Sequence, residues 1–247
     1  MYTGKILLKR ETKNYDAGYC ILHSGMPEIL TEVPLLHPEE KAYFDTLQFD
    51  RRRESYLQGR IAAKKAVKAL LPHIPLPDIL ISQGIFQFPV VKIPAAHNIQ
   101  VSISHCDDIG IGIAFPEEHP LGIDIEQIDD NKTAAIKGQV SDKELLLLPG
   151  CGLTLTSGCA LLWTVKEALS KIFRTGLMMN FHSLAIQTLT REGALYVSTF
   201  SNFAQYRAVT CLTATHACSL VLPRKTTVEL NTFLEALTGR PWNNYVS

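Results

Sequence analysis

The chain has 247 residues, of which 46% are hydrophobic and 19% charged. It can bury a sizeable core in one large domain or two small ones, which excludes a disordered or collagen-like chain. Basic and acidic residues balance at 24 each, so we expect no general nucleic-acid coating, which needs a net basic surface. We also expect no membrane segment, and the six scattered cysteines without a CxxC pair favour reduced thiols in a cytoplasmic protein.

The first 35 residues predict short strands and loops, and residues 36–71 predict a helical region. Pro38 and the two following glutamates suit its beginning, and Pro72 ends it. Gly59 marks either a break or a close contact within this region. The later predicted strands cover residues 78–91 (strand, turn, strand), 100–115 (a hairpin), 121–128, 183–189, 194–200 and 206–222. The later predicted helices are 141–148, 160–173 and 228–237, and residues 150–158 predict a mobile loop. The first of these helices begins with a capping box, in which Ser141 is the N-cap and Glu144 follows three residues later.

A faint internal repeat connects the two halves of the chain. Residues 64–67 (KKAV) resemble residues 166–169 (KEAL), 102 positions later. The hairpin QVSISHCDDIGIGIAFP resembles RAVTCLTATHACSLVLP, 107 positions later. Two copies of a helix-plus-hairpin unit would explain both matches, and chance likeness between amphipathic helices is the alternative.

Two groups of carboxylates stand out. Asp124 and Glu126 are two apart on a predicted strand, so they share a face and repel unless a cation lies between them. Glu167 and Lys171 are four apart on a predicted helix and share a face there. A solvent-facing pair and an ordinary surface ion pair are the respective alternatives. Together, three carboxylates could hold one hard cation, and Mg²⁺ suits a sparse oxygen site that admits phosphate.

Two other segments could meet an anion. Ser102-x-Ser104-His105 ends a predicted strand, where hydroxyls and an imidazole could donate to phosphate, with a structural histidine as the alternative. Residues 51–68 contain seven basic residues and one acid, Glu54, which makes either a local anion-attracting patch or a solvated helix face.

In order, these segments resemble the 4′-phosphopantetheinyl transferases of the larger, surfactin-type (Sfp-like) class. The resemblance rests on PEEK (38–41), GRIAAKKA (59–66), FPVV (88–91), SISH (102–105), GIDIE (122–126) and WTVKEALSK (163–171). It implies an α+β fold of two similar halves related by a pseudo-twofold, with the active site at their interface. Residues 1–118 would form the coenzyme A side, and residues 119–247 would carry the metal and the catalytic helix.

The resemblance implies a holo-[acyl-carrier-protein] synthase that moves 4′-phosphopantetheine from coenzyme A to a serine of an apo carrier protein, releasing adenosine 3′,5′-bisphosphate. Its cofactor would be Mg²⁺, or Mn²⁺ in its place. By motif, Asp124, Glu126 and Glu167 would be metal ligands, Glu167 also the base, and Lys171 the cation that neutralises the pyrophosphate, with Asp124 counted among the catalytic groups. The residues implied to bind coenzyme A are Lys41, Arg53, Arg60, Pro89, Ser104, His105, Asp124, Lys166 and Lys171.

The chain departs from the family pattern at Gln87, before the FPVV segment, at Cys106 after the SISH histidine, and at Glu40 and Tyr43, where basic residues are usual. Lys41, Arg53 or Arg60 would then meet the 3′-phosphate. We expect a monomer that meets its carrier transiently, through the segment 132–158, although a buried core helix is the alternative there. An inactive binding protein on the same fold and a metal-dependent coenzyme A phosphoesterase are the competing functions.

Overall fold

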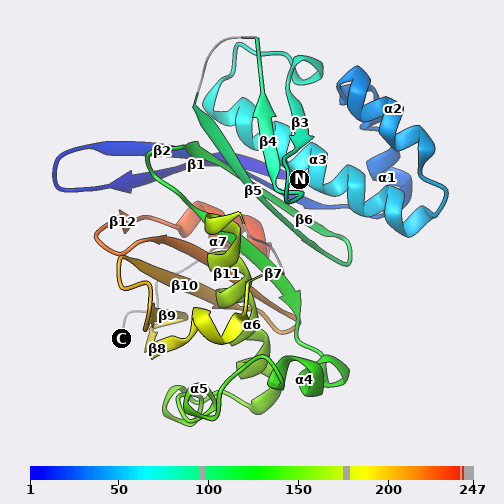
Figure 1. The fold of residues 1–247 in the computed structure, drawn as a ribbon. Helices are drawn as coiled ribbons and strands as arrows, with labels where there is room; N and C mark the ends of the chain where they lie inside the picture. The colour runs from blue at the N-terminus through cyan, green and yellow to red at the C-terminus, as the bar shows by residue number, and fades with distance from the viewer. Residues whose placement is uncertain (95–97, 175–178, 240, 242–247) are drawn as a thin grey trace. The chain divides into compact units, whose positions relative to one another are not determined.

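The computed structural model describes residues 1–94, 98–174, 179–239 and 241. It divides into two compact units, the first built on Met1–Pro120 with Thr227–Arg240 and the second on Leu121–Thr226. Each unit combines helices with an antiparallel sheet (Figure 1), so the expected α+β class is confirmed.

The first unit has a five-stranded sheet in the order β12-β1-β2-β6-β5, with α3 packed against β2 and β6. A separate hairpin, β3-β4, lies beside β5. Its strands are β1 (Tyr2–Lys9), β2 (Asn14–His23), β3 (Leu80–Gln83), β4 (Pro89–Lys92), β5 (Ile99–Cys106), β6 (Ile109–Pro116) and β12 (Thr227–Val228). Its α-helices are α1 (Met26–Leu30), α2 (Pro38–Thr46), α3 (Asp50–Leu70) and α7 (Asn231–Thr238).

The helical region expected over residues 36–71 is two helices rather than one. The break lies between α2 and α3, where Leu47 and Phe49 have extended backbone. Gly59 lies inside α3 and marks a close contact instead, because a Cβ there would lie 3.3 Å from Cγ2 of Ile103. The hairpin expected at 100–115 is present as β5 and β6, with its turn at Asp107 and Asp108.

The second unit has a five-stranded sheet in the order β7-β11-β10-β9-β8, with α6 packed against β7 and β11. Its strands are β7 (Gly122–Gln127), β8 (Ile186–Glu192), β9 (Leu195–Phe200), β10 (Tyr206–Leu212) and β11 (His216–Pro223). Its α-helices are α4 (Asp130–Lys137), α5 (Asp142–Leu145) and α6 (Leu155–Phe173), with short 3₁₀ turns at Pro149–Cys151 and Phe181–Leu184.

Two expectations about the second half need correction. Helix α6 begins at Leu155, inside the expected loop 150–158, because the Thr154 side chain caps it by accepting from the amide of Ser157. The second half was expected to run to residue 247, whereas β12 pairs with β1 and α7 packs on β1 and β2. The chain therefore returns to the first unit after Thr226.

The internal repeat appears in the order of the elements. In each unit a strand is followed by helices, a hairpin and a second hairpin, so that β2, α3, β5 and β6 correspond to β7, α6, β10 and β11. The long helix approaches its strand at a glycine in both: a Cβ at Gly18 would collide with the carbonyl oxygen of Ala66, and one at Gly122 with that of Ala168. Ala66 and Ala168 are 102 positions apart, which is the offset seen in the sequence.

Each unit has its own hydrophobic core between its long helix and its sheet. All six cysteines are buried, and none of them forms a disulfide. Within the described ranges no single helix has the length and apolar composition to cross a membrane; Asp142–Cys151 and Leu155–Phe173, bent by 117°, meet that criterion only when taken together.

Candidate active site

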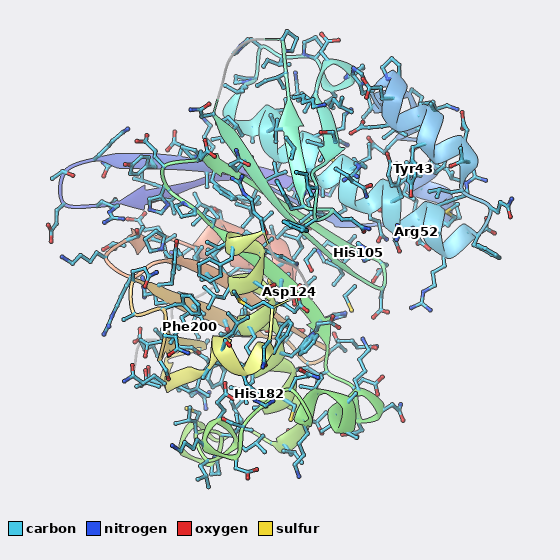
Figure 2. The ribbon with its side chains drawn as sticks, viewed as in Figure 1. Tyr43, Arg52, His105, Asp124, His182 and Phe200 are labelled. Carbon is cyan, nitrogen blue, oxygen red and sulfur yellow. The ribbon has the colours of Figure 1, made fainter. Side chains whose placement is uncertain are left out.

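The carboxylates of β7 face the helix of their own unit. Strand alternation puts Asp124 and Glu126 on one face, while Ile123 and Ile125 are buried on the other. Asp124 is only 5% exposed, and Glu126 is half-buried. Figure 2 labels Asp124 on its strand. A buried carboxylate requires a cation or hydrogen-bond donors beside it, so we expect a positively charged group against this face of β7.

Helix α6 supplies that partner. Lys171 Nζ donates to Asp124 Oδ1 at 2.7 Å and to the carbonyl oxygen of Ile123 at 2.8 Å. Lys132, on α4, donates to Glu126 Oε2 at 3.1 Å. The two motifs, far apart in sequence, thus meet in one place, with Glu167 one turn before Lys171 on the same helix. Sequence reasoning did not identify Lys132.

Glu167 has a raised pKa. Burial, followed by the neighbouring charge of Asp124, raises its pKa from 4.5 to about 7; Glu126 adds to the rise, and Lys171 only partly offsets it. Three carboxylates are therefore close enough to feel one another. A half-buried glutamate with a pKa near neutrality can both give up and accept a proton under physiological conditions.

The donor chemistry of these residues fits a divalent metal. Asp124, Glu126 and Glu167 offer hard oxygen ligands, and their mutual repulsion is the strain that a doubly charged cation relieves. Lys171 forms an ion pair with Asp124, and Lys132 forms one with Glu126. A metal ion would therefore share these two acids with the lysines. Mg²⁺ is the cation that such a sparse oxygen set, completed by water or phosphate, suits best.

Lys166 does not belong to an open ligand site. Its ammonium group is fully buried and lies 2.9 Å from Glu144 Oε1. It also donates to the carbonyl oxygens of Gln139 at 3.1 Å and Phe181 at 3.2 Å. The expectation that Lys166 contacts coenzyme A is corrected, because these three acceptors take up all the hydrogen-bonding capacity of a lysine. The capping box at Ser141 pointed to Glu144, but no sequence signal linked Glu144 to Lys166.

The first unit contains an equivalent buried glutamate–lysine pair. Lys64, on α3, is fully buried and lies 2.6 Å from Glu40 Oε2. Glu40 Oε1 accepts from the amide of Ile81, just as Glu144 Oε1 accepts from the amide of Ile186, each at 2.9 Å. Glu40 is the fourth residue of a capping box begun by His37, as Glu144 is of the box begun by Ser141. Lys64, part of the basic run, is therefore not available to an anion.

Two arginines of α3 remain suited to an anion. Arg53 and Arg60 are seven apart and so share a helix face. Their guanidinium carbons lie 4.6 Å from the ring centre of Phe44 and 4.9 Å from that of Tyr56. Neither forms a salt bridge within the described residues. Stacking on the rings holds the guanidinium groups in place and leaves their charge uncompensated, which suits phosphate recognition.

The other residues expected to bind coenzyme A in the first unit differ from one another in exposure and in their contacts. Lys41 is exposed and pairs with Asp45 at 2.6 Å, one turn along α2. Pro89 begins β4 and is half-buried. Ser104 is buried and His105 exposed on β5, and Figure 2 labels His105. Consecutive strand residues point to opposite faces, so Ser104 lies on the buried face of β5 and His105 on the exposed one.

Comparison with known proteins finds a similarity to one family within the second unit. Residues 120–221 match the family model of the 4′-phosphopantetheinyl transferase superfamily. The match runs from the residue before Leu121 into β11, and it includes the three carboxylates and Lys171. A search of the curated proteins finds no match. That superfamily transfers phosphopantetheine from coenzyme A to carrier proteins with the help of a divalent metal, and the chain is similar to it over residues 120–221.

Proposed function

We propose that the protein transfers the 4′-phosphopantetheine group of coenzyme A to a serine of an apo carrier protein, as a surfactin-type holo-[acyl-carrier-protein] synthase. The supporting observation is the meeting of β7 and α6, where burial, followed by the neighbouring charges of Asp124 and Glu126, raises the pKa of Glu167 to about 7. A bound Mg²⁺, or Mn²⁺, would supply positive charge to the diphosphate of coenzyme A.

The residues of this chain have separate tasks in that reaction. Glu167, which lies beside the two acids of β7, takes the proton of the carrier serine hydroxyl as its oxygen attacks the β-phosphorus. The bond from phosphorus to the bridging oxygen breaks, and adenosine 3′,5′-bisphosphate leaves with the electron pair. Lys171, whose ammonium group is held beside Asp124, provides a fixed positive charge for the phosphate oxygens as negative charge builds up.

The first unit would hold the nucleotide end of coenzyme A. Arg53 and Arg60 offer two fixed guanidinium groups to the 3′-phosphate, and the aromatic rings beneath them exclude water from one side. Lys41 and His105, both exposed, are the secondary candidates. Lys166 has no part in this role.

The carrier protein would meet the segment 132–158. Leu146 is 78% exposed at the end of α5, whereas Leu148 is buried in the core. An exposed leucine at the end of α5, which packs against the helix that carries Glu167, suits the apolar part of a transient protein contact. We expect Leu146→Gln to raise the KM for the carrier and to leave that for coenzyme A unchanged. Leu148→Gln is the contrasting variant, and it should lower the melting temperature instead.

Intact-mass measurement of a panel of apo carrier proteins, incubated with the protein, coenzyme A and Mg²⁺, tests the proposal. Transfer adds the phosphopantetheine mass to a carrier and releases adenosine 3′,5′-bisphosphate. Cleavage of coenzyme A without a modified carrier would instead indicate a phosphoesterase. Binding of coenzyme A without any turnover across the panel would indicate a binding protein.

A further inference from the structure

The buried pair Glu144–Lys166 ties α6 to three other segments. Glu144 Oε2 accepts from both the amide and the hydroxyl of Ser141 at 2.8 Å, and Oε1 accepts from the amide of Ile186 at 2.9 Å. Lys166 reaches the carbonyl oxygens of Gln139 and Phe181. The start of α5, the first residue of β8 and the middle of α6 are therefore joined by directed hydrogen bonds.

Glu167 follows Lys166 directly, so the pair acts next to a carboxylate of the candidate metal site. The sheet side of α6 is held separately. Thr164 Oγ1 lies 2.7 Å from Ser219 Oγ, which lies 2.7 Å from Thr210 Oγ1. With Lys171 bound to Asp124 near the other end, Glu167 lies on a helix held on two sides. A small rotation of α6 would move its carboxylate relative to β7.

The first unit shows that this pair is independent of the acids themselves. If Gly18 corresponds to Gly122 and Ala66 to Ala168, the positions of Asp124, Glu126 and Glu167 are occupied there by Cys20, Leu22 and Lys65. The Glu40–Lys64 pair is present all the same, with the same bond to a strand amide. The pair is thus part of the repeated scaffold, and in the second unit alone it adjoins a carboxylate site.

We propose that Glu144 and Lys166 are positioning residues that set the direction of the Glu167 carboxylate and thereby the metal affinity of the second unit. The inference rests on the proposed function for its metal. Burial of two charges gives little net stability compared with apolar side chains of the same volume. An apolar pair cannot reproduce the directed hydrogen bonds of Glu144 and Lys166. Loss of these hydrogen bonds should therefore weaken metal binding in a protein that still folds.

The test compares two matched double variants. Glu144→Leu with Lys166→Met removes the pair in the second unit, and Glu40→Leu with Lys64→Met removes its counterpart in the first. Affinity for Mn²⁺ alone is measured by electron paramagnetic resonance without substrate, melting is followed by calorimetry, and kcat and KM for coenzyme A are measured with an apo carrier. Lys166→Arg, which keeps the charge but changes the length of the side chain, serves where the double variant does not fold.

We expect the second-unit variant, or Lys166→Arg, to melt cooperatively and to bind Mn²⁺ about 10- to 100-fold more weakly than the wild type. The fold decrease in its kcat should exceed the fold increase in its KM for coenzyme A. The first-unit variant should keep the wild-type Mn²⁺ affinity. Unchanged Mn²⁺ affinity in a folded second-unit variant, or equal weakening in both, would overturn the inference. A wild-type protein that binds Mn²⁺ but modifies no carrier would instead count against the proposed function, and the Mn²⁺ comparison would still decide the role of the pair.

Discussion

Glu167 depends on its neighbours for its chemistry. On an exposed helix face it would be an ordinary acid paired with Lys171, which is one interpretation of the sequence. In the structure it is partly buried beside Asp124, and the charged form is disfavoured by burial first and by the second carboxylate next. The same repulsion that raises its pKa is what a metal ion would relieve.

The raised pKa of Glu167 predicts a pH dependence of stability in the metal-free protein. The folded pKa, about 7, exceeds 4.5, so the folded state binds this proton more tightly than the unfolded state. Its contribution to stability is complete below pH 4.5 and is lost as the pH rises through about 7. In EDTA, the wild type should therefore lose more melting temperature between pH 5 and pH 8 than Glu167→Gln does. Identical pH profiles for the two proteins would contradict this assignment.

At the scale of elements, the site exists because α6 lies unusually close to β7. Gly122 permits the approach, since any side chain there would meet the carbonyl oxygen of Ala168. Close approach lets Lys171 reach Asp124 and brings Glu167 near the acids of the strand. The glycine of the GIDIE motif thus has a packing role, next to the ligand roles that we propose for its acids.

Gly122→Ala should force α6 away from β7. Overpacking at such a contact costs about 1–3 kcal/mol, which lowers the melting temperature of a chain of this size by about 2–10 °C. Calorimetry measures the loss, and Mn²⁺ affinity should fall with it. Gly150→Ala is the control, because a Cβ at Gly150 has no atom within 4 Å. Equal melting temperatures for the two variants would show that the glycine is not needed for packing.

The presence of the helices and strands that carry the motifs could be predicted from the sequence better than the residues at which they begin and end. Alternation identified β7 and the hairpin β5-β6, and the capping box of Ser141 was correctly placed. The start of α6 was missed because Gly and Thr favour loops locally, whereas burial of Gly158 against Leu148 and the cap at Thr154 favour the helix. The ion pairs could not be predicted, since Glu144 and Lys166 are brought together only by tertiary packing.

For the molecule as a whole, the two units share an order of elements and differ in the charged residues on those elements. Both have a long helix packed on a sheet through a glycine and a buried glutamate–lysine pair. Only the second has the three acids at this helix and strand, while the first has stacked arginines on α3. We therefore propose that the second unit binds the metal and that the first binds the nucleotide phosphate.

This division predicts separable effects of substitutions. Arg53→Ala and Arg60→Ala should each raise the dissociation constant of coenzyme A about tenfold, the value of one charge-assisted contact, and leave Mn²⁺ affinity unchanged. Arg52→Ala is the matched control, because Arg52 is exposed on the same helix (Figure 2). Isothermal titration measures both ligands. Equal affinity for coenzyme A in all three variants would remove the arginines from the binding site.

The central claim, that carrier modification depends on the carboxylates of β7 and α6, is tested most directly by comparing the wild type with Asp124→Ala. The rate of phosphopantetheine transfer to an apo carrier is measured by intact mass at saturating coenzyme A and Mg²⁺. The account predicts transfer by the wild type and a loss of about a thousandfold, or about 4 kcal/mol of transition-state stabilisation, in a folded Asp124→Ala. Near-wild-type transfer by the folded variant would contradict it.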